Sequence, residues 1–263
     1  MLARTIVAAL VAGALLSAAR AAAENPGTYA VGNIPVAGTI ATVQLPLTPG
    51  LATEIGGAAL GQGTYQNDNP FAYLSLVAGT AWLHFDGVQN LRLSAGFQEF
   101  LYKSIPPLGV KDSHEERLVL RARVQQPRGA AALYEMLQLD VRSFNYPTGE
   151  NRYLVYRPRF RVGQGFNLDA QRISSLVLYQ EIAFRFSPDP YAKRAFEFFR
   201  AYFGYLWTTQ RGTFVSLGIL GQIGLNPGAT RYDLLWGPVL GISHWFRAEK
   251  PEAPPPAPDA EVQ

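Results

Sequence analysis

The stretch between residues 115 and 162 decides the fold. It reads EERLVLRARV over residues 115–124, LQLDVR over 137–142 and YRPRFRV over 156–162. In each segment, charged or amide side chains alternate with apolar ones. Successive side chains of a β-strand point to opposite faces, so each segment predicts a strand with one ionic and one apolar face. Three such strands in succession are typical of a transmembrane β-barrel, in which apolar residues face lipid and polar residues face the lumen.

The composition suits a single barrel. The chain has 263 residues, with 25 glycines and 19 prolines that mark frequent turns between short strands. It has no cysteine, which excludes disulfides and thiolate metal ligands. The mean hydropathy is zero, too polar for a helical membrane protein but suited to a wall in which only alternate residues meet lipid.

The two ends of the chain differ from the rest. Residues 1–23 read as a secretory signal, with Arg4 before an apolar run over residues 6–16 and small residues at the cleavage position. Residues 24–35 form a Gly/Pro/Asn-rich N-terminal segment, and residues 36–246 are expected to form the barrel. Residues 247–263 hold five prolines and predict a disordered tail.

The signal and the barrel together predict the outer membrane of a Gram-negative bacterium. The expected partners are outer-membrane lipid and lipopolysaccharide, with the barrel-insertion machinery during biogenesis. The net charge of +3 falls to +1 without Arg4 and Arg20, so we expect no nucleic-acid partner. Nothing in the pattern predicts an oligomeric state.

The chain offers eleven strand candidates, yet bacterial barrels have even strand numbers. We therefore expect an all-β transmembrane antiparallel up-and-down barrel of about 12 strands, with a first strand inside residues 24–35. Ten strands is the alternative, if residues 36–45 lie outside the wall. Short and longer links alternate along the chain, and the longer set is predicted to face the outside because barrels of this class have short periplasmic turns.

The ionic faces of the strands supply the candidate functional residues. Twelve of these side chains are predicted to line the lumen, as a pore or as a packed network: Arg92, Arg117, Arg121, Arg123, Asp140, Arg142, Arg157, Arg159, Arg161, Glu181, Arg185 and Arg200. Arginine outnumbers lysine by 19 to 4, which suits a lumen network, although a GC-rich genome would give the same ratio. Basic linings favour anions. The pattern leaves two alternatives, a narrow anion-preferring channel and a structural barrel with a filled lumen.

The alternative to a channel or a structural barrel is an enzyme that modifies lipids of the outer leaflet. Some outer-membrane barrels cleave lipids, and a Ser/His hydrolase would need the two side chains within hydrogen-bond reach. Ser113 and His114 are adjacent, as are Ser243 and His244, so a strand would point each pair to opposite faces. Asp112, His114 and Glu116 form a weak metal-ligand pattern. We therefore predict no catalytic residue, no metal and no cofactor.

The order of motifs resembles an uncharacterised family of bacterial outer-membrane β-barrels, a domain of unknown function with repeated Arg-x-Arg strands. The resemblance spans residues 72–246 and is carried by Glu116 and Arg117, Asp140 and Arg142, the RPRFR run at 157–161, and Glu181 with Phe184. The closing strand resembles the terminal strand of such barrels, but a tail follows Phe246 here. The resemblance implies a barrel in the outer membrane and implies no activity.

Overall fold

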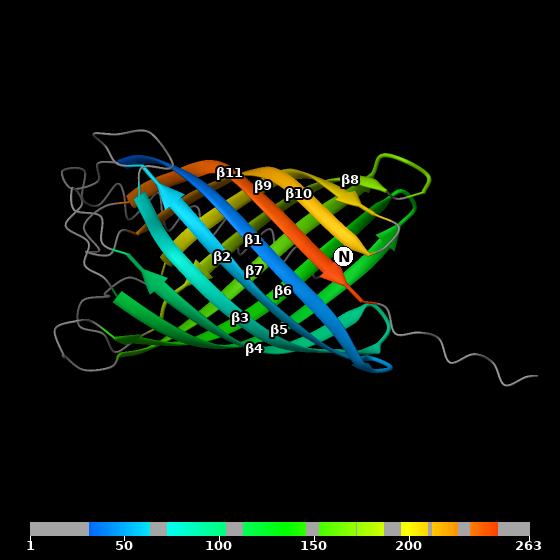
Figure 1. The fold of residues 1–263 in the computed structure, drawn as a ribbon, viewed down its shortest axis with the longest axis horizontal. Coiled ribbons are helices and arrows are strands. Elements are labelled where there is room, and N and C mark those ends of the chain that lie inside the picture. Colours follow the sequence, from blue (N-terminus) through cyan, green and yellow to red (C-terminus); the bar gives the residue numbers. More distant parts are fainter. Residues whose placement is uncertain are drawn as a thin grey trace, which may run out of the picture.

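The computed structural model describes residues 32–63, 73–103, 113–145, 153–171, 173–186, 196–209, 212–225 and 232–246. This part of the chain forms one closed barrel, which confirms the predicted all-β barrel fold (Figure 1). The expected signal at 1–23 and tail at 247–263 lie outside the described residues. The strands are β1 (Gly32–Thr48), β2 (Leu51–Gln62), β3 (Tyr73–Val88), β4 (Leu91–Tyr102), β5 (Ser113–Arg128), β6 (Ala131–Asn145), β7 (Tyr153–Asn167), β8 (Ser174–Phe184), β9 (Phe196–Thr208), β10 (Thr213–Leu225) and β11 (Tyr232–Trp245).

The described barrel has eleven strands, so the expected count of twelve is wrong, and so is the alternative of ten. All eleven candidate segments lie in the wall, and the first strand begins at Gly32, inside the expected N-terminal segment. The even-number expectation assumes that the first and last strands pair antiparallel. Here β1 and β11 pair in parallel, while each sequential pair of strands is antiparallel. An odd number of strands closes in this way without leaving an edge.

The parallel seam has a local irregularity at Gly237. Its register runs from Gly32 opposite Asp233 to Gln44 opposite Trp245, with a break between the Pro35 and Gly38 pairings. A Cβ atom at Gly237 would lie 1.7 Å from the carbonyl oxygen of Val36, so the close approach of the two strands requires glycine there.

The links between strands separate into two sets at opposite ends of the barrel. At the short-turn end, tight connections join β1 to β2 and β3 to β4, with positive φ at Gly50 (79°) and Asn90 (63°). The long-loop end carries the links at 64–72, 104–112, 146–152, 187–195 and 226–231 and the start of β1. The predicted alternation of links is therefore present.

The outer surface of the wall is apolar on every strand. Each strand exposes at least one large apolar side chain: Leu45, Ile55, Leu83, Phe97, Leu118, Leu137, Phe160, Leu178, Phe203, Leu217 and Trp236 on β1 to β11 in order. The exposed fractions of Leu217 and Ile219 reach 58% and 62%. Soluble monomers rarely expose a continuous apolar surface of this kind, because it would drive association in water. Among the described residues, no helix is long and apolar enough to cross a membrane.

Candidate functional site

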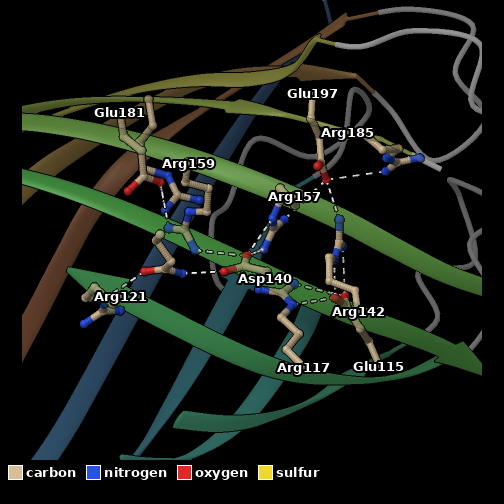
Figure 2. A network of polar contacts seen from close by, with 12 residues as sticks. Glu115, Arg117, Arg121, Asp140, Arg142, Arg157, Arg159, Glu181, Arg185 and Glu197 are labelled. Atoms are coloured by element: carbon tan, nitrogen blue, oxygen red, sulfur yellow. Dashed lines mark hydrogen bonds and ion pairs between the residues drawn. The ribbon is translucent and has the colours of Figure 1, made fainter. Parts of the chain in front are cut away.

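The interior of the barrel contains a continuous network of ion pairs carried by β5 to β9. Four carboxylates and seven guanidiniums are linked in it, and we call this set the lumen network (Figure 2). Its members are Glu115, Arg117, Asp140, Arg142, Arg157, Arg159, Arg161, Glu181, Arg185, Glu197 and Arg200. The alternation read from the sequence explains their shared direction, because their apolar neighbours on β5, β6 and β7 are exposed on the outer wall.

Glu115 organises the network near the long-loop end. Its side chain is fully buried and accepts hydrogen bonds from the guanidiniums of Arg117 and Arg142, which lie opposite each other on β5 and β6. Two like charges facing across strands would repel, and the shared carboxylate offsets that repulsion. The Tyr102 hydroxyl donates to Glu115 at 2.7 Å.

Asp140 occupies the middle of the network on β6. It is fully buried and lies 2.5 Å from Arg157 Nη2 and 3.4 Å from Arg159 Nη1. The side-chain amide of Gln138 donates to Asp140 at 2.6 Å and accepts from Arg121 at 2.8 Å. Gln138 is only 1% exposed, so a buried amide connects Arg121 to the charged centre.

Glu181 on β8 is shared by three guanidiniums from two neighbouring strands. Arg159 and Arg161 on β7 lie 2.7 Å and 2.6 Å away, and Arg200 on β9 lies 3.5 Å away. The Glu181 side chain is fully buried, whereas those of Arg161 and Arg200 are about a quarter exposed. At this point of the network, a buried carboxylate therefore lies beneath two guanidiniums that remain partly accessible.

Glu197 enters the lumen because of a β-bulge. Ala183 pairs with Phe198 and Phe184 pairs with Phe196, which leaves Glu197 without a partner in the ladder. An extra residue in one strand turns its side chain, so both Glu197 and Phe198 are buried instead of alternating. The Glu197 carboxylate lies 2.7 Å from Arg142 and 3.3 Å from Arg157. Arg185, just beyond β8, approaches it at 3.4 Å.

The network carries more positive than negative charge. Its seven guanidiniums share four carboxylates, and burial of an unpaired ion costs several kcal/mol, so each carboxylate is held by two or three arginines. The remaining predicted lumen arginines lie toward the short-turn end. Arg92 pairs with Asp86 at 2.6 Å, whereas Arg121 and Arg123 have no carboxylate of the described residues within ion-pair distance.

Within the described strands, the wall opposite the network carries no lysine or arginine and is lined by small and aliphatic side chains. The hydrogen bond between Thr42 and Ser243 (2.9 Å) and the pairing of Arg200 with Gln222 identify the inward faces of β1, β11 and β10. The inward positions of β10, β11, β1 and β2 next to these include the small residues Ser216, Gly218, Gly241, Gly38, Gly56 and Ala58, and the aliphatic residues Ile40, Leu60 and Val239. The bulky charged side chains therefore lie on one side of the lumen, and the other side mixes small and aliphatic side chains.

All twelve predicted lumen residues carry a polar or ring contact on the inner side, and sequence reasoning missed several of their partners. Glu115 stood in the alternating pattern but was not among the predicted site residues. Glu197 was missed because strict alternation places it outward. The sequence also gave no signal for a buried contact between His84 Nδ1 and Ser94 Oγ (2.8 Å), with Glu54 Oε2 3.5 Å from His84 Nε2.

The serine and the histidine at 243–244, one of the two pairs considered above, have different partners. His244 Nδ1 lies 2.8 Å from Thr213 Oγ1, while Ser243 turns inward to Thr42. His114 contacts Glu99 at 2.9 Å, and Asp112 lies outside the described residues. Within the described ranges, no group of three or more His, Asp or Glu is arranged to hold a metal ion.

Comparison with models of known protein families gives no match to this sequence, and comparison with curated proteins gives none either.

Proposed function

We propose that the protein is an outer-membrane β-barrel with a narrow, anion-preferring passage through its lumen. The observation that carries the proposal is the asymmetry of the interior: an arginine-rich wall with excess positive charge faces β10, β11, β1 and β2, which contain no lysine or arginine. Basic linings attract anions and repel cations, and the inward glycines of the facing wall leave room beside the network. The resemblance to an uncharacterised family of outer-membrane barrels is consistent with the location.

The membrane location is supported by the outer wall. Every strand exposes large apolar side chains, and the charged residues point inward, as expected of a barrel in lipid. If the proposal is correct, the protein stays with the membrane fraction after a carbonate wash. Its release into the soluble fraction would instead support a secreted barrel.

A closed structural barrel is the second candidate, and one contact favours it. Arg142 on β6 bonds to Glu197 on β9 across two intervening strands, so the network bridges part of the lumen. Barrels of 8 strands have filled interiors and those of 16 or more have aqueous channels, so eleven strands permit either outcome.

Ion conductance of the refolded protein in a planar bilayer distinguishes the candidates. The sharpest variants are Arg121→Gln and Arg123→Gln, because neither removes the partner of a buried carboxylate. Arg128→Gln is the matched control, since Arg128 is an exposed residue at the end of the same strand. We expect discrete openings that prefer anions, with reduced preference in the two lumen variants alone. A folded barrel without current would favour the structural candidate.

A further inference from the structure

Arginines in the half of the lumen toward the short-turn end share a layered arrangement. In each layer a guanidinium lies over an aromatic ring. For Arg121 and Arg123, a glycine on one strand leaves space that the ring from the neighbouring strand covers, and for Arg161 the ring rests on a second ring. Because glycine lacks Cβ, the ring can approach the backbone closely. The ring then supports the planar guanidinium through a cation–π contact and limits its freedom.

Arg121 has this arrangement on β3 to β5. Trp82 pairs with Gly96, and a Cβ at Gly96 would lie 2.3 Å from the Trp82 ring. The Arg121 Cζ atom is 4.1 Å from the centroid of that ring. Its Nε donates to Gln138, and the guanidinium has five N–H donors in total, so most of its donor edge has no hydrogen-bond partner among the described residues.

Arg123 repeats the arrangement with different strands. Tyr134 on β6 pairs with Gly163 on β7, where a Cβ would lie 2.1 Å from the Tyr134 ring. The Arg123 Cζ atom is 5.3 Å from the ring centroid. Its guanidinium makes a 3.4 Å contact with Gln125, which is long for a hydrogen bond.

Arg161 completes the set from β7. Its Cζ atom lies 4.2 Å from the centroid of Tyr179, a ring that stacks in turn on Tyr202 at 5.0 Å. Arg161 and Arg123 both pair with Met136 in the sheet, so they lie on either side of that residue with their Cα atoms about 10 Å apart. Arg121 and Arg123 are two residues apart on one face of β5, which puts their Cα atoms about 7 Å apart.

The charge balance of these three arginines is strongly positive. Arg161 shares Glu181 with Arg159 and Arg200, and no carboxylate of the described residues lies within ion-pair distance of Arg121 or Arg123. Cations at this spacing repel one another unless an anion lies between them. Guanidinium forks match the oxygen geometry of phosphate and carboxylate groups, and they bind polyvalent oxyanions better than halide-like point charges.

We propose that Arg121, Arg123 and Arg161 form a binding site for a polyvalent oxyanion, of which phosphate and pyrophosphate are the simplest members. The inference rests on the proposed function, because it names the class of anion that the passage selects. The ring platforms hold the guanidiniums in place, so the site is organised before the anion arrives. Pyrophosphate binds more tightly than phosphate because its two groups reach two arginines.

The test is calorimetric titration of the refolded full-length barrel with pyrophosphate, phosphate and acetate. We expect saturable binding in that order of affinity. Arg121→Gln and Arg123→Gln each weaken pyrophosphate binding by about tenfold or more, as the loss of one charged hydrogen bond predicts. Arg128→Gln removes the same charge from an exposed position on β5 and leaves binding unchanged. Arg121→Lys keeps the positive charge but loses the forked guanidinium, so its affinity for pyrophosphate lies between that of the parent protein and that of Arg121→Gln.

A difference in electrophoretic mobility between unheated and heated samples confirms that each variant is folded before titration. The site is disproved if pyrophosphate does not bind the folded barrel, or if the lumen variants bind as Arg128→Gln does. If the barrel prefers anions in the bilayer but gives either of these binding results, the anion-preferring passage stands and the oxyanion site is disproved. If the barrel carries no current but binds pyrophosphate through Arg121 and Arg123, the oxyanion site stands and the passage is disproved.

Discussion

Arg142 Nη1 on β6 lies 2.7 Å from Glu197 Oε1 on β9, although β7 and β8 separate the two strands in the sheet. The contact therefore crosses the interior of the barrel and does not follow its wall (Figure 2). Arg157 on β7 joins the same oxygen at 3.3 Å. The carboxylate of Glu197 thus links three regions of the wall at the bulge where β9 leaves regular pairing.

Removal of this charge is predicted to destabilise the barrel. Glu197→Gln leaves Arg142, Arg157 and Arg185 with less compensating charge in a buried site, and such losses cost about 3–5 kcal/mol. Urea unfolding in lipid vesicles measures the free energy of unfolding. Glu99→Gln is the matched control, because Glu99 has a half-exposed side chain and its pair with His114 is worth at most about 1 kcal/mol. Equal effects of the two variants would contradict a supporting role for the bridge.

Glu181→Gln is predicted to separate selectivity from stability. The loss of one carboxylate shared by three arginines makes the lumen more positive, so the preference for anions in the bilayer rises. The same change lowers the free energy of unfolding by about 3 kcal/mol, since buried guanidiniums lose their partner. Reversal potentials under a salt gradient give the preference. A folded variant with unchanged reversal potential would place Glu181 away from the conduction path.

Two glycines on one face of β7 offer a paired test of the ring platform. A Cβ at Gly163 would lie 2.1 Å from the Tyr134 ring, whereas one at Gly165 would lie at an ordinary 3.8 Å. Gly163→Ala therefore displaces the ring and costs about 1–3 kcal/mol by overpacking. Gly165→Ala stays within about 0.5 kcal/mol of the parent. Thermal unfolding compares the two, and pyrophosphate affinity falls in Gly163→Ala alone.

The turn between β7 and β8 is predicted to weaken only in strong acid. Asp169 accepts hydrogen bonds from the Ser174 hydroxyl and from the backbone N–H groups of Ile173 and Ser174, and these lower the pKa of its carboxyl. Because the pKa is lowered in the folded state, the ionised Asp169 carboxylate contributes its full stabilisation of the turn above the ordinary aspartate pKa. This stabilisation is lost as the pH falls through the lowered pKa.

Limited proteolysis at the turn across a pH series checks this prediction, using an acid-active protease. Cleavage in the parent increases only below the ordinary aspartate range. In Asp169→Ala the turn is cleaved at every pH tested. Parallel pH profiles for the two proteins would show that the carboxylate does not hold the turn.

The parallel pairing of β1 with β11 predicts an unusual topology. The start of β1 lies at the long-loop end and the end of β11 lies at the short-turn end (Figure 1). With the long-loop end outside the cell, a protease site placed before Gly32 is cleaved in intact cells, as is one in the link between β4 and β5. A site in the turn at Gly129 is protected until the outer membrane is permeabilised. Protection of the site before Gly32 would contradict the parallel seam.

The strands could be predicted from the sequence because the two environments differ sharply. Leu118 and Leu120 meet the outside while Arg117 and Arg121 meet the interior, and the apolar Val119 is the one inward exception between these two arginines. Tyr134, by contrast, fits the pattern of aromatic residues near strand ends that favours the membrane interface, yet its ring lies in the lumen over Gly163. A ring near a strand end suits both places, and only the pairing with a glycine across the strands distinguishes them.

Closure and cross-lumen contacts could not be predicted from local pattern. Strand direction at the seam depends on residues about 200 positions apart, such as Gln44 and Trp245, and neither segment encodes its partner. The bulge at Glu197 breaks alternation by one residue, which a periodic reading assigns to the opposite face. The rule that bacterial barrels have even strand numbers then favoured twelve or ten strands over the eleven candidates read from the sequence.

The parallel seam also bears on ancestry. A barrel that grows by duplication of β-hairpins gains two strands at each step, so hairpin duplication alone always yields an even count. By that route, eleven strands are reached only with one further event that adds or removes a single strand. Such an event reverses the direction of one terminal strand relative to its new neighbour. Parallel closure is the geometry that keeps a barrel with an odd number of strands sealed, as the seam between β1 and β11 does here.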